Sequence, residues 1–87
     1  MTQQLRFTGE SRPLRALLVA TDEGIVVRLR DLVARMPVPI EVDWANSFEA
    51  GFSRMTSRRY DVHLVGEELG GRSGIELMRE YNEAGGV

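Results

Sequence analysis

The chain has 87 residues, enough for one small domain, and a formal net charge of -2 at pH 7. Its 43% hydrophobic and 28% charged residues are typical of a globular domain, and this charge excludes a general attraction to nucleic acid or membrane surfaces. The chain has no cysteine and one histidine, which excludes disulfides and thiolate metal sites and argues against structural zinc.

The first strand and helix are predicted after a polar N-terminal arm, residues 1–13, that shows no periodicity. The nearly continuous apolar run from Leu14 to Ala20 predicts a central parallel strand that is covered on both faces. Thr21 or Asp22 can cap a following helix, and the prolines at positions 37 and 39 end it. The apolar stripe of this helix recurs at helical spacing and consists of Ile25, Leu29, Leu32, Val33 and Met36.

Two more strand-helix pairs follow along the chain. Residues 40–44 alternate apolar and acidic side chains, which predicts a half-covered strand. Ser47 can cap a second helix, and a third strand is predicted from Asp61 to Val65. Ser73 begins a capping box, the pattern in which a serine is followed three residues later by a glutamate, and this predicts a third helix.

The connections between these elements are short, so the strands must be parallel and the crossovers right-handed. The sequence therefore predicts one α/β domain over residues 14–87, with the element order βαβαβα. In such a doubly wound sheet, helices cover both faces, and ligands bind at the carboxyl ends of the strands.

From Leu14 to Gly86 the sequence resembles the first three strand-helix units of a response-regulator receiver domain. The strongest match runs from Arg59 to Arg79, where the family has a similar strand, loop and Gly-x-Glu-Leu helix start. The runs LLVATDE and WANSFEAG are similar to the family's opening strand with its acidic turn and to its second helix. The resemblance implies a flavodoxin-like sheet with strand order 2-1-3, truncated to three strands.

Receivers accept a phosphoryl group on an aspartate at the end of the third strand, beside Mg²⁺ held by two acidic residues after the first strand. On this chain the phospho-acceptor position falls on Gly66, and the two metal-ligand positions fall on Ala20 and Thr21. Only Asp22, one residue further on, keeps a carboxylate. The family's later Thr and Lys, which complete the switch, are also missing. The resemblance therefore implies a degenerate pseudo-receiver of a bacterial two-component or phosphorelay pathway, with no catalytic residue.

Two alternatives remain open on the sequence. Glu67 or Glu68 could accept a phosphoryl group with help from Asp22, which would make the domain an atypical phosphorylatable receiver. The glycine-rich loop from Gly70 to Gly74 precedes a helix and could instead cradle the phosphate of a nucleotide. It lacks the lysine of a P-loop, and a tight turn before a helix cap explains the same glycines.

The predicted partner surface is the third strand with the helix after it. Because the chain stops at Val87, where receivers have a fourth strand, the third strand is expected to be an exposed apolar edge. We expect association, most simply a two-fold homodimer, or binding to another signalling protein, in the cytoplasm and without nucleic acid or membrane. The predicted interface residues are Val62, Leu64, Val65, Ile75 and Met78.

Overall fold

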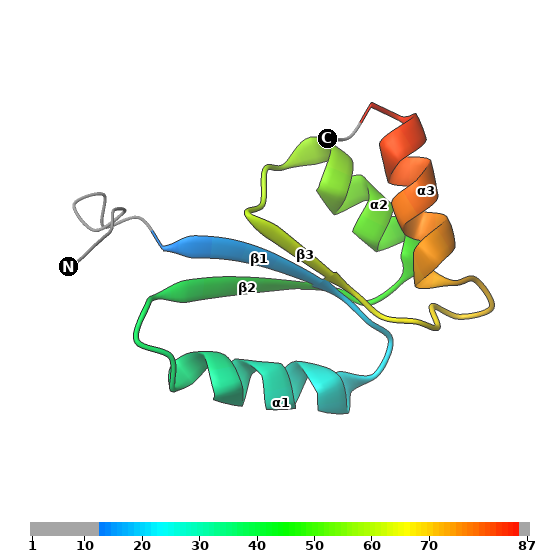
Figure 1. The fold of residues 1–87 in the computed structure, drawn as a ribbon. Coiled ribbons are helices and arrows are strands. Elements are labelled where there is room, and N and C mark those ends of the chain that lie inside the picture. Colours follow the sequence, from blue (N-terminus) through cyan, green and yellow to red (C-terminus); the bar gives the residue numbers. More distant parts are fainter. Residues whose placement is uncertain (1–12, 86–87) are drawn as a thin grey trace.

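The computed structural model describes residues 13–85, so the predicted arm lies almost entirely outside the described residues. Three strands alternate with three helices, as predicted (Figure 1). No helix within residues 13–85 has the length and apolar character needed to cross a membrane. The elements are β1 (Leu14–Val19), α1 (Glu23–Ala34), β2 (Ile40–Ala45), α2 (Phe48–Ser57), β3 (Val62–Val65) and α3 (Gly74–Glu83).

The three strands form one parallel sheet in the order β2-β1-β3, which confirms the predicted order. β1 pairs along its whole length with β2, from Leu14 opposite Ile40 to Val19 opposite Ala45. Its side chains from Ala16 onward are buried, as expected for a central strand. α1 lies on one face of the sheet, and α2 and α3 lie together on the other (Figure 1).

A hydrophobic core lies on each face, because successive side chains of a strand point to opposite sides. Leu17 and Val19 of β1 point toward α2 and α3, and Leu18 points toward α1. The core beneath α2 and α3 contains Leu17, Val19, Ala45, Phe48, Met55, Leu69 and Leu77. The smaller core beneath α1 contains Leu18, Ala20 and Val26, with Leu29, Val42 and Trp44 packed against it.

Side-chain caps fix where the helices begin. Of the two candidates before α1, Asp22 is the cap, and its Oδ1 accepts a hydrogen bond from the backbone N–H of Gly24 at 2.8 Å. Ser47 caps α2 through the backbone N–H of Ala50. The capping box predicted at the start of α3 is present, and a cap of this kind typically stabilises a helix by about 1 kcal/mol.

The predicted apolar stripe of α1 is only partly buried. The residue that α1 buries is Val26, which is 3% exposed. By contrast, Ile25, Leu32 and Met36 are 38%, 58% and 50% exposed, although they recur at helical spacing. Part of the predicted stripe is therefore a flank of the helix, and no second helix among residues 13–85 lies on this face of the sheet to cover it.

Candidate functional site

The carboxyl ends of β1 and β3 lie side by side. The backbone N–H of Gly66 donates a 2.7 Å hydrogen bond to the carbonyl of Val19. A Cβ atom built on Gly66 would lie 3.7 Å from the Cα atom of Ala20 and 3.2 Å from the carbonyl oxygen of Val19. The structure thus brings together the positions where the receiver resemblance places the phospho-acceptor and a metal ligand. Neither position carries a carboxylate.

The carboxylates nearest to these strand ends have other contacts or point into solvent. Asp22 is exposed and caps α1, and Thr21 beside it is exposed. An oxygen of Glu68 accepts a hydrogen bond from the backbone N–H of Gly71 at 3.0 Å. The side chain of Glu67 is exposed. Nowhere in the described part of the chain do three or more His, Cys, Asp or Glu side chains gather where they could hold a metal ion.

The loop from Gly70 to Gly74 is a tight turn in which the amide groups of Gly71, Ser73 and Gly74 already have acceptors. Gly70 and Gly71 have φ angles of 64° and 91°, a conformation that glycine adopts without strain. The N–H of Gly74 donates to the carbonyl of Glu67, and the carboxylate of Glu76 accepts from the N–H of Ser73. A phosphate bound here would have to displace these acceptors and lie beside the negative charge of Glu76.

Within residues 13–85 the sheet has two edge strands, β2 and β3, and the predicted interface residues of the sheet lie on β3, which pairs only with β1. Val62 and Leu64 point to the same face of the sheet as α1. They remain 44% and 38% exposed, because α1 packs over β2 on that face and leaves β3 uncovered. His63 and Val65 point to the opposite face and are half-buried. Exposed backbone groups along such an edge can pair with another extended segment.

α3 follows β3 along its length on the face opposite to α1. Gly74 at the start of α3 lies against Gly66, and the ring of Tyr81 near its end is 5.3 Å from the ring of His63. Met78 and Ile75 are rotated about 100° and 160° around α3 from buried Leu77, on the side that faces away from α2. Ile75 is 71% exposed, whereas Met78 is half-buried against the core. Of the five predicted interface residues, Val62, Leu64 and Val65 therefore lie on the β3 edge, whereas Ile75 points away from the sheet and Met78 packs against the core.

Charged side chains of opposite sign flank this edge. Arg58 and Arg59 precede β3, and Glu67 and Glu68 follow it, and all four are exposed. None of the ion pairs found in residues 13–85 involves these side chains. Arg58 and Arg59 were not among the predicted site residues. The available signal was their position directly before an apolar run that ends in two glutamates.

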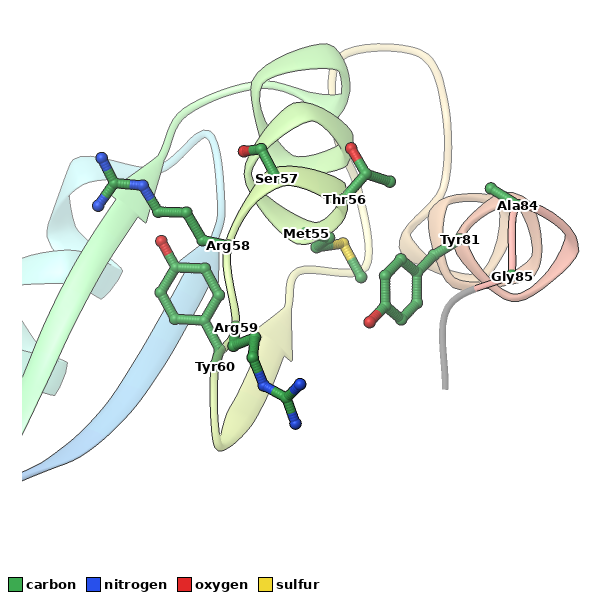
Figure 2. Close-up of a pocket in the computed structure, with 9 residues that line it drawn as sticks. All are labelled: Met55, Thr56, Ser57, Arg58, Arg59, Tyr60, Tyr81, Ala84 and Gly85. Carbon is green, nitrogen blue, oxygen red and sulfur yellow. The ribbon is translucent and has the colours of Figure 1, made fainter.

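The amino end of β3 borders a cavity of about 380 Å³ between α2 and α3, lined by Met55, Arg59, Tyr60 and Tyr81 among others. Figure 2 shows the guanidinium groups of Arg58 and Arg59 pointing in different directions and away from Tyr81. The hydroxyl of Tyr60 donates to a carboxylate oxygen of Asp43 at 2.7 Å. The cavity therefore does not present converging positive charges that would bind an anion.

Two titratable groups near β3 have shifted pKa values. Burial lowers the pKa of His63, because a partly desolvated imidazole is less stable in its charged form. A hydrogen bond to Tyr60 raises the pKa of Arg54, which also forms a 3.3 Å ion pair with Asp43. Arg54 is therefore charged at every physiological pH, and His63 is the one group here whose charge changes near neutrality.

The geometry combines strand ends that carry Ala20 and Gly66 in place of carboxylates, a glycine loop in which three amides have acceptors, and an exposed strand edge. Comparisons of the chain with models of protein families, with curated proteins and with solved structures found no match. The likeness to receiver domains therefore rests on the sequence motifs and the strand order.

Proposed function

We propose that this domain is a non-catalytic, receiver-like signalling module that acts by binding another protein through the β3 side of its sheet. The observation that carries the proposal is Gly66. It occupies the carboxyl end of β3, beside Ala20, where phosphoryl transfer by a receiver would need a carboxylate nucleophile. Glycine provides no nucleophile, and alanine provides no metal ligand.

The chemistry of phosphoryl transfer supports this reading. An aspartate attacks the phosphorus atom, and Mg²⁺ neutralises the charge that develops on the phosphoryl oxygens. Oxygen-ligand sites for Mg²⁺ use one or two carboxylates held in near-octahedral geometry. Here Asp22 accepts the N–H of Gly24 and Glu68 accepts the N–H of Gly71, so both carboxylates already stabilise local structure.

The fold supports the same proposal. A parallel sheet ordered β2-β1-β3, with α1 on one face and α2 and α3 on the other, is the arrangement expected of the first half of a flavodoxin-like receiver. With the edge strand β3 exposed, association replaces catalysis as the way such a domain transmits a signal. The setting proposed is the cytoplasm of a bacterium, in a two-component or phosphorelay pathway.

The test is an amide NMR titration of the protein with Mg²⁺ and beryllofluoride, which mimics an acyl phosphate. We expect dispersed resonances that do not move, because position 66 carries no carboxylate to hold the mimic. Saturable shifts at Asp22 and at residues 66–68 would contradict the proposal and identify an atypical phosphorylatable receiver. A parallel titration with ATP tests the nucleotide alternative, for which shifts would appear at residues 70–74.

The matched control is the double variant Thr21→Asp/Gly66→Asp, which adds carboxylates beside Asp22 and at the end of β3. Its two new side chains start near neighbouring strand ends, because residue 21 follows Ala20, whose Cα atom is 3.7 Å from a Cβ atom at residue 66. We expect this variant to bind Mg²⁺ and to show shifts around the substituted positions. That result would show that the method detects a restored site in this fold, so that unshifted resonances in the unmodified protein are meaningful.

A further inference from the structure

The β3 edge has three properties of a strand-binding site. Its backbone is unpaired on one side within residues 13–85, because the sheet ends at β3. Val62 and Leu64 present exposed apolar side chains on one face, and half-buried Val65 lies on the other. An extended segment added beside β3 would gain backbone hydrogen bonds and apolar contacts on both faces.

The position of α3 decides what kind of segment fits. Gly74 and Tyr81, near the two ends of α3, contact Gly66 and His63, so the helix lies above β3 along its length. If a second copy paired its own β3 with this one around a two-fold axis, the two α3 helices would also meet at that axis. Paired strands are about 4.8 Å apart, whereas packed helices need 8–10 Å. A strand that carries no helix above it avoids this overlap.

The flanking charges decide the orientation. Arg58 and Arg59 lie before β3 with one carboxylate, Asp61, which accepts from the N–H of Arg15. Glu67 and Glu68 lie after β3, so the amino end of the edge carries a net positive charge and the carboxyl end a negative one. A segment running antiparallel to β3 has its amino end beside Glu67 and its carboxyl end beside Arg59. Antiparallel pairing is also slightly more stable per residue than parallel pairing. Charge complementarity then requires basic residues at the amino end of the segment and acidic residues at its carboxyl end.

We propose that the β3 edge binds one extended segment of a partner protein, antiparallel to β3, with basic residues at its amino end and acidic residues at its carboxyl end. The inference rests on the proposed function, because it names the partner of the same surface. The central residues of the segment alternate between the face of Val62 and Leu64 and the face of α3. The affinity comes from backbone pairing and apolar contact, and the charges fix direction and register.

The test uses two designed peptides of equal composition, RRGTVTVTGEE and EEGTVTVTGRR, titrated into the protein at pH 7.5 and followed by amide NMR. We expect the first peptide to bind with shifts confined to β3, its flanking residues and the outer side of α3. We expect it to bind about three- to tenfold more tightly than the second, because exposed ion pairs contribute little individually. The charge-exchange variant Arg59→Glu/Glu67→Arg should reduce or reverse this preference.

Matched substitutions separate the edge from the rest of the surface. Val62→Lys places a charge on the exposed apolar edge and should abolish peptide binding while the protein stays folded, because Val62 is 44% exposed. Val27→Lys makes the same change on the outer surface of α1, where Val27 is 62% exposed, and should leave binding unchanged. The far-ultraviolet circular dichroism of both variants checks that the fold is intact.

Three results would overturn the inference. The first is that neither peptide shifts the β3 resonances at peptide concentrations up to about 1 mM. The second is tighter binding of EEGTVTVTGRR, which would mean parallel pairing. The third is self-association that broadens or shifts β3 resonances as the protein is concentrated, which would make a second copy the occupant. All three are independent of the Mg²⁺ and beryllofluoride titration, so failure here is distinguishable from failure of the proposed function.

Discussion

Gly74, the first residue of α3, lies directly against the backbone of Gly66 at the carboxyl end of β3. A Cβ atom at residue 74 would overlap the carbonyl oxygen of Gly66 and would lie 2.8 Å from Cγ1 of Val65. The two glycines are eight positions apart, and the intervening loop returns the chain so that α3 packs closely on the strand. This contact fixes where α3 begins over the sheet.

Replacing Gly74 with alanine should therefore destabilise the fold. Alanine favours a helix by up to about 1 kcal/mol over glycine, but the added methyl group must displace backbone atoms of β3, and overpacking typically costs about 1–3 kcal/mol. We expect a net loss of about 1 kcal/mol or more in the free energy of unfolding, measured by urea denaturation. Asn82→Ala, on the exposed surface of the same helix, is the control and should change stability by less than about 0.5 kcal/mol.

Leu77 and Ile75 test how burial divides α3. Leu77 is 0% exposed, so Leu77→Ala leaves a cavity beneath α2 and α3 and should cost about 2–5 kcal/mol. Ile75 is 71% exposed, and Ile75→Ala should cost less than about 0.5 kcal/mol. Thermal unfolding monitored by circular dichroism compares the two variants. Equal losses would show that α3 does not pack on the sheet through the face that carries Leu77.

The capping box at the start of α3 should contribute measurably to stability. In Ser73→Ala the N–H of Glu76 loses the hydroxyl acceptor that lies 3.1 Å away. We expect a loss of about 0.5–2 kcal/mol, because an uncapped helix leaves amide groups without partners. Ser73→Thr keeps a hydroxyl and should recover most of the loss. An unchanged midpoint for Ser73→Ala in urea would contradict this role.

His63 should make stability fall as pH falls below neutrality. Burial lowers the pKa of His63 in the folded protein, so the unfolded chain, with a histidine pKa near 6.5, binds the proton more readily. The stabilisation is fully present above about pH 6.5 and is lost as pH falls from there to the folded pKa. Because His63 is the only histidine, His63→Gln should flatten the profile between about pH 7.5 and 5.5.

Urea midpoints at the two pH values, at protein concentrations where the domain is monomeric, give this comparison. The unmodified protein should lose more stability than His63→Gln on acidification. Carboxylates titrate mostly at lower pH, so they add little in this window. A steeper profile for the variant than for the unmodified protein would contradict the prediction.

For α1, the sequence predicted the helix but not the residue that it buries. Helical spacing correctly predicted α1 and its approximate ends, because periodicity and capping are local properties of the chain. The same spacing placed Ile25, Leu32 and Met36 in the buried stripe, although Val26 is the residue that faces the sheet. The rotation of a helix about its own axis depends on the strands against which it packs. A broad apolar stripe is compatible with several rotations, so the sequence alone does not specify which residue is buried.

The degenerate acidic site was predictable in its residues but not in its geometry. The resemblance to receiver domains placed Gly66 and Ala20 at strand ends, and the parallel order brings those ends together. The contact of Glu76 with the N–H of Ser73 followed from the predicted capping box. The hydrogen bond from the N–H of Gly74 to the carbonyl of Glu67 was not predictable, because it forms only when the turn closes. These contacts weaken the nucleotide alternative more than the missing lysine does.

The sequence by itself determined the order, type and approximate bounds of the elements, because hydrophobic periodicity, helix caps and turn residues act over a few neighbouring residues. It also determined that Gly66 ends the third strand without a carboxylate. Only the tertiary structure decided that α3 lies along β3 and that Val62 and Leu64 stay exposed at the edge of the sheet. Those features depend on packing between segments that are distant in the chain, and packing is fixed only when the whole sheet assembles.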